Sequence, residues 1–112
     1  MVKAVYTLKA KIGSSRSLYE VLKSISNRTR YMAGCMESEI WYKKETSTIM
    51  LSESWRSMKD LKMHIVSPPY RQMLAALELS SVKPVISFYE CGQIRSIDLI
   101  EEVLLNQKDL VI

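Results

Sequence analysis

The first twelve residues alternate between apolar and polar side chains. Every second position from Val2 to Ile12 is apolar, and most of the positions between them are lysine or threonine. A period of two places the apolar set on one face of a strand. Apolar residues then recur every three or four positions, a spacing that predicts a helix over residues 15–29.

The same two periods predict the elements that follow. In order, these are strands at 35–42 and 48–55, short helices at 58–65 and 70–77, and a strand at 85–91. The order strand, helix, strand, strand, helices, strand is the split β-α-β arrangement of ferredoxin-like folds. We therefore predict an α+β fold in which helices cover one face of a four-stranded antiparallel sheet.

The opposite face of this predicted sheet also carries apolar residues. Val5, Trp41, Met50 and Ile86 or Phe88 fall on it in this interpretation. Since a large exposed apolar patch is rare on a monomer, we expect a homodimer, with sheets packed face to face or with exchanged tails.

The chain divides into one domain at 1–92 and an extension at 93–112. Ser96 can cap a helix in the extension, and the chain ends on Leu110-Val111-Ile112. We expect this apolar extension to form an extra C-terminal helix at the dimer interface.

Composition and charge exclude several classes of protein. Hydrophobic residues make up 47% of the 112 and charged residues 25%, as in ordinary folded domains. The net charge of +4 permits a nucleic-acid partner, but the basic residues are scattered among acidic ones, so none is expected. No apolar run approaches the ~18 residues that span a bilayer, and the N-terminus lacks the apolar segment of a signal peptide. A cytoplasmic location without a membrane partner follows as the expectation.

No cofactor or metal is expected from the motifs. Cys35 and Cys91 lack the spacing of a metal knuckle or a redox motif, and we expect both thiols to be inert and reduced. The chain has no glycine-rich nucleotide loop and no paired histidines.

His64 is the only histidine and the first candidate for chemistry. Its ordinary pKa lies near neutrality, so it could deprotonate a phenol or a hydroquinone. The alternative is a helix-end imidazole bonded to a carbonyl group or to a loop amide around Ser67. Trp55 could form a wall of an aromatic pocket, and Tyr6 and Tyr70 could hydrogen-bond a substrate hydroxyl. For these three aromatic residues the alternative is packing in the core.

A resemblance narrows these options. It is carried by Ser54-Trp55-Arg56-Ser57, Leu61, His64, Ser67-Pro68-Pro69-Tyr70 and the earlier Gly34-Cys35. This pattern resembles the antibiotic biosynthesis monooxygenase family, in which a strand ends in Trp and a capped helix ends near His before a Ser-Pro step. The likeness covers residues 1–91.

The resemblance implies a dimeric ferredoxin-like α/β barrel and a small cofactor-independent monooxygenase. The expected substrate is a quinol-like or aromatic small molecule, with His64 catalytic. Aromatic polyketide oxygenases carry Asn where this chain has Leu51, and haem-degrading relatives carry the haem-ligating His where it has roughly Leu74. Haem degradation is therefore disfavoured, and both leucines are expected to contact substrate.

Two other functions stay open. A non-catalytic, dimeric metabolite-binding or stress-response protein could have the same fold. An RNA-binding ferredoxin-like module ranks last, because residues 47–54 lack the glycine and aromatic residues that stack bases in such strands.

Overall fold

The computed structural model describes residues 1–90 and 93–106. Its elements in chain order are β1 (Val2–Lys9), α1 (Ser15–Thr29), β2 (Cys35–Lys43), the 3-10 helix η1 (Lys44–Thr46), β3 (Thr48–Trp55), α2 (Met58–Val66), α3 (Tyr70–Glu78), β4 (Val85–Glu90), β5 (Gln93–Arg95) and α4 (Ile97–Leu105). The predicted strand end at Cys91 and the apolar terminus at 110–112 lie outside the described residues.

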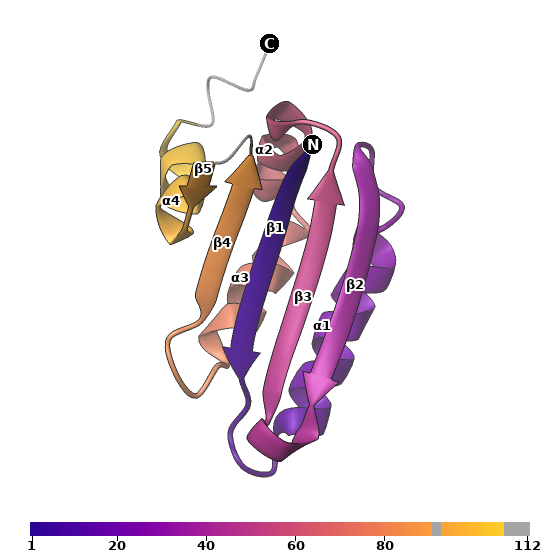
Figure 1. Ribbon diagram of the computed structural model, residues 1–112, viewed down its shortest axis with the longest axis vertical. Coiled ribbons are helices and arrows are strands. Elements are labelled where there is room, and N and C mark those ends of the chain that lie inside the picture. The colour runs from indigo at the N-terminus through magenta and orange to yellow at the C-terminus, as the bar shows by residue number, and fades with distance from the viewer. Residues whose placement is uncertain (91–92, 107–112) are drawn as a thin grey trace.

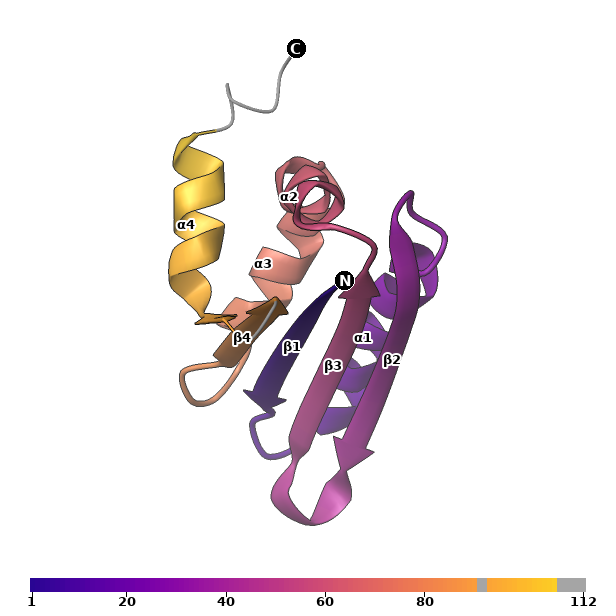
Figure 2. The same cartoon turned by 45° about the horizontal axis from the view of Figure 1, so that its top comes forward.

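The strands form one antiparallel sheet in the order β2-β3-β1-β4-β5, with α1, α2 and α3 on one of its faces (Figure 1). The predicted ferredoxin-like α+β fold is therefore confirmed. The four expected strands gain a short fifth strand, β5, which pairs with β4. The predicted extra helix is α4, which packs against α2 and β4 (Figure 2). No helix within the described residues is both long and apolar enough to cross a membrane.

The helix-facing side of the sheet forms the core. Val2, Ala4, Tyr6 and Leu8 of β1 are buried, as the alternation predicts. The core also includes both Ile86 and Phe88, which corrects their assignment to the opposite face: Tyr6 pairs with Ile86 and Ala4 with Phe88 on β4. Since both neighbours of a cross-strand pair point to the same side of a sheet, these two side chains face the helices.

The other side, which we call the outer face, has no described helix over it and is the side seen in Figure 1. Trp41 and Met50 are paired there and remain 49% and 39% exposed. Val85, Tyr89 and Ile94 add further exposed apolar side chains to this outer face. The predicted second apolar face is present, although β4 contributes different residues to it.

The chain between β3 and α3 positions the candidate site. The Ser57 hydroxyl accepts a hydrogen bond from the Asp60 amide at 3.2 Å and caps α2, as predicted. After α2, the carbonyls of Pro68 and Pro69 accept hydrogen bonds from the first turn of α3, where a missing proline N–H costs nothing. The end of α2 and the start of α3 thereby lie over the helix-facing side of the sheet, which we call the inner face.

Candidate functional site

Five buried side chains from four elements meet beneath the α2–α3 turn. They are Tyr6 on β1, Glu53 and Trp55 on β3, His64 on α2 and Tyr70 on α3. His64 is 3% exposed, Tyr70 is 1% exposed and the other three are fully buried. We call this group the aromatic–acid cluster.

Aromatic packing fixes the His64 imidazole. The Trp55 ring stacks on it at 4.6 Å between centroids, and the Tyr70 ring meets it edge-on at 4.9 Å. Neither ring nitrogen of His64 has a hydrogen-bond partner among the described residues. The Ser67 hydroxyl instead donates to the backbone carbonyl of His64, at 2.6 Å. The imidazole is thus held in place by packing, and the alternative of a carbonyl-bonded ring is not what the structure shows.

Glu53 is the unexpected member of the cluster. It lies on the inner face between Leu51 and Trp55, and its carboxylate accepts a hydrogen bond from the Trp55 indole at 3.2 Å. The same oxygen, Oε1, lies 3.9 Å from Nε2 of His64, while Oε2 has no partner among the described residues. Since a buried polar atom without a partner is costly, this arrangement points to a functional role.

Burial sets the protonation of the pair. Loss of solvation raises the pKa of Glu53 to about 7, opposed by the hydrogen bond from Trp55. The same effect lowers the pKa of His64 to about 4. His64 is therefore uncharged at neutral pH, with a free lone pair that can accept a proton.

Two tyrosine hydroxyls lie beside this pair. The hydroxyls of Tyr6 and Tyr70 are hydrogen-bonded at 2.7 Å. Burial raises the pKa of both phenols, so both stay protonated across the ordinary pH range.

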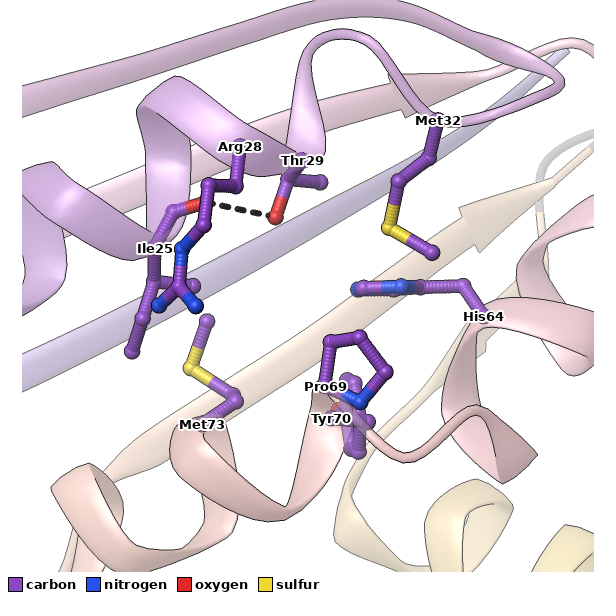
Figure 3. Close-up of a pocket in the computed structure, with 8 residues that line it drawn as sticks. All are labelled: Ile25, Arg28, Thr29, Met32, His64, Pro69, Tyr70 and Met73. Atoms are coloured by element: carbon purple, nitrogen blue, oxygen red, sulfur yellow. Dashed lines mark hydrogen bonds between the residues drawn. The ribbon is translucent and has the colours of Figure 1, made fainter.

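A cavity of about 230 Å³ opens onto the imidazole (Figure 3). It is lined by Ile25, Arg28, Thr29, Met32, His64, Pro69, Tyr70 and Met73. The lining is mostly apolar, and two methionines give it adaptable walls. The Thr29 hydroxyl donates to the Ile25 carbonyl at 2.8 Å, and Arg28 donates to the side chain of Gln72. Such a cavity suits a small, flat, largely apolar molecule with few polar groups.

The structure brings some of the predicted site residues to this cavity and leaves others in the core. His64 and Tyr70 line it. Trp55 lies against His64 and Tyr6 bonds Tyr70, so both support lining residues. Leu51 is fully buried in the core, and Leu74 packs half-buried against it; neither is among the lining residues.

Sequence reasoning missed Glu53 and the contribution of α1. An acidic residue on the apolar side of an alternating strand is the signal that could have singled out Glu53. The α1 residues that line the cavity carry no chemical signal of their own. Among the described residues, no group of three or more His, Cys, Asp and Glu side chains is placed to hold a metal ion, and the expectation of no cofactor stays a prediction.

Comparisons with solved structures support the fold. A "putative antibiotic biosynthesis monooxygenase" from Deinococcus radiodurans superposes with a TM-score of 0.73 at 24% identity, covering 83% of this chain and 94% of that one. A protein with the same description from Nitrosomonas europaea gives 0.71 at 14% identity, covering 80% and 97%. A conserved protein from Methanosarcina mazei gives 0.71 at 19%, covering 80% and 90%.

Sequence comparison adds nothing to this, because neither the models of known families nor the curated proteins give a match. The class that fold and site define is a ferredoxin-like α+β domain with a buried imidazole at the end of an apolar cavity. Within that class, the chain has an antibiotic biosynthesis monooxygenase-like fold.

Proposed function

We propose that this protein is a small monooxygenase that acts on a quinol-like or aromatic molecule without a bound cofactor. The observation that carries the proposal is the apolar cavity that ends on an uncharged imidazole with no hydrogen-bond partner among the described residues. A base of that kind, held rigidly beside an apolar ligand, suits deprotonation of a phenolic hydroxyl. Two structural neighbours are each described as a "putative antibiotic biosynthesis monooxygenase", which supports the monooxygenase part of this proposal.

In the proposed reaction, His64 takes the proton from one hydroxyl of a hydroquinone. The resulting anion gives electrons to O2, and a bond forms between a ring carbon and one oxygen atom. His64 then returns its proton to the outer peroxide oxygen, which leaves as water together with the hydrogen of the oxygenated ring carbon as the O–O bond breaks. Overall, a hydroquinone and O2 become a hydroxyquinone and water: the ring loses four electrons, which O2 accepts as the sole oxidant.

The neighbouring residues have distinct roles in this proposal. Trp55 and Tyr70 hold the imidazole plane, and the edge of Tyr70 forms part of the cavity wall. The apolar lining excludes water, which strengthens the interaction of the phenolate with nearby dipoles. Arg28 brings a guanidinium group to the lining, and it favours a substrate that becomes an anion during the reaction.

The same proposal includes a homodimer joined through the outer face. Trp41, Met50, Tyr89 and Ile94 form an apolar surface there that is unusual for a monomer. A two-fold axis over this outer face would pack two sheets together and leave one cavity in each subunit.

Oxygen uptake with a panel of hydroquinones tests the proposed activity. We expect uptake above the uncatalysed rate, and a fall of about 10²-fold or more in His64→Gln, because general-base catalysis typically contributes that much. Lys59→Gln changes an exposed residue of the same helix and serves as the matched control. Equal uptake by His64→Gln and the control would remove His64 from the mechanism. Ligand-induced thermal stabilisation without uptake would instead favour the non-catalytic binding protein.

A further inference from the structure

We propose that Glu53 is a positioning residue that selects which nitrogen of His64 accepts the substrate proton. In this arrangement the Glu53 carboxylate accepts a hydrogen bond from Nε2–H, and Nδ1 is left as the proton acceptor. The inference rests on the proposed role of His64 as the base, and it adds the group that holds that base in its reactive form.

The geometry favours this pairing. Oε1 of Glu53 lies 3.9 Å from Nε2, so an approach of about 1 Å would make an ordinary hydrogen bond. Glu53 is fully buried and receives one hydrogen bond, from the Trp55 indole, which leaves Oε2 unpaired. Both His64 nitrogens are likewise unpaired among the described residues, so no competing partner in that part of the chain fixes the ring. Oε1 can accept a second hydrogen bond beside the one from Trp55, so the Glu53 carboxylate is a partner within reach of Nε2.

Four other ionisable groups face the pair from the surrounding elements. Tyr6 on β1, Cys35 on β2 and Tyr70 on α3 all interact with the Glu53 charge, and burial raises the pKa of each. Arg28 on α1 lines the cavity with His64. Near neutral pH, Glu53 is therefore the member of this group whose protonation changes, while His64 stays uncharged.

The state of Glu53 then decides whether His64 can act. When the carboxylate is ionised, it accepts from Nε2–H and leaves the Nδ1 lone pair free. When it is protonated, its O–H donates to Nε2, which places the ring proton on Nδ1 and removes the acceptor. Once Nδ1 has taken a substrate proton, the Glu53 carboxylate faces a positively charged imidazolium. The attraction between the two charges is strong because the site holds little water.

Nitrogen NMR of the ring tests this directly, because His64 is the only histidine in the chain. In protein labelled with ¹⁵N-histidine, we expect the ring proton to move from Nδ1 to Nε2 as pH rises through Glu53 ionisation. Glu53→Gln keeps the shape and removes the titration, so the move should be lost there. Glu78→Gln, an exposed change on α3, should behave as the unaltered protein does.

Two results would overturn the inference. One is the same pH response in Glu53→Gln as in the unaltered protein. The other needs no variant: a ring proton that stays on Nδ1 at a pH well above the Glu53 titration. The measurement uses neither substrate nor turnover. If the position of the ring proton depends on Glu53 but the protein consumes no oxygen, the result counts against the proposed function and not against this inference.

The pH dependence of activity gives a second readout. We expect kcat/KM to rise as Glu53 ionises in the unaltered protein, and this rise to disappear in Glu53→Gln. A profile that keeps the same rise in the variant would assign the ionisation to another group. If oxygen uptake depends on His64 but Glu53→Gln keeps the pH dependence of kcat/KM, the role of Glu53 is overturned and the proposed function stands.

Discussion

At the scale of single residues, Glu53 and His64 respond to burial in opposite directions. The pKa of His64 falls from its ordinary 6.5 to about 4, so its protonation favours the unfolded chain and stability rises with pH between these values. The pKa of Glu53 rises from its ordinary 4.5 to about 7, so its ionisation favours the unfolded chain and stability falls with pH between these values. The two trends nearly cancel in the unaltered protein.

Single substitutions should separate the two trends. We expect the unfolding free energy of Glu53→Gln to rise between pH 4 and 6.5, because only the His64 trend remains. That of His64→Gln should fall between pH 4.5 and 7. Each change should approach about 3 kcal/mol, at roughly 1.4 kcal/mol per pKa unit. Urea unfolding across this pH range measures the unfolding free energy of both variants. If that free energy depends on pH in neither variant, the opposite pKa shifts of Glu53 and His64 are contradicted.

How far the sequence predicts the site depends on the residue. His64 attracts notice because it is a single histidine, and Trp55 and Tyr70 because they stand in a recognisable pattern. The two-residue period of β3 puts Glu53 on the same face as Leu51 and Trp55, but it does not single Glu53 out as a site residue. Its missing hydrogen bond depends on which side chains of other elements surround it, and that requires the folded structure. The lining residues of α1 depend in the same way on how that helix lies over the sheet.

At the scale of elements, periodicity predicts those parts of the chain in which one face differs from the other. The alternation along β1 and the cap at Ser57 are both confirmed. The assignment of Ile86 and Phe88 was wrong because β4 is apolar on both faces, so its sequence does not say which face meets the helices. The strand β5 has three residues, too few to show a period.

The junction before α2 offers a test at this scale. Gly34 has a φ of +84°, and a β-carbon placed there would overlap the side chain of Asp60 in the first turn of α2. Gly13 has nearly the same φ, +85°, but nothing lies within 4 Å of such a carbon. Both alanine variants should lose stability through backbone strain, and Gly34→Ala should lose about 1–3 kcal/mol more through the clash.

Urea unfolding of the two alanine variants compares these costs. Since α2 carries His64, the displacement of that helix in Gly34→Ala should also lower oxygen uptake, whereas Gly13→Ala should retain it. Equal losses of stability in both variants would show that the close approach of Gly34 to Asp60 adds nothing to the stability lost in Gly34→Ala.

At the scale of the whole molecule, the order of elements is enough to predict the fold, but the fold alone does not determine the chemistry. The structural neighbours share the architecture at 24% identity or less. The chemistry has to be argued from this chain's own residues: the aromatic–acid cluster lies under an apolar cavity, and the other side of the same sheet carries exposed apolar side chains.

The outer face predicts the state of assembly. Trp41→Glu places a charge on the outer face, opposite Met50 of the neighbouring strand, so we expect a dimer in the unaltered protein and a monomer in this variant, measured by sedimentation velocity. Tyr31→Glu changes another aromatic residue, 85% exposed and outside the sheet, and this variant should remain dimeric. A monomer at high concentration of the unaltered protein, or a dimer in Trp41→Glu, would contradict this interface.

The central claim is that the cavity at His64 directs O2 onto a quinol-like substrate, and labelled oxygen tests it most directly. The protein is mixed with a hydroquinone under ¹⁸O2, and the masses of product and water are measured against His64→Gln and a reaction without protein. We predict that one ¹⁸O atom enters the product and the other enters water, at a rate that collapses in His64→Gln. A product without ¹⁸O, or labelling at the same rate without His64, would contradict the account.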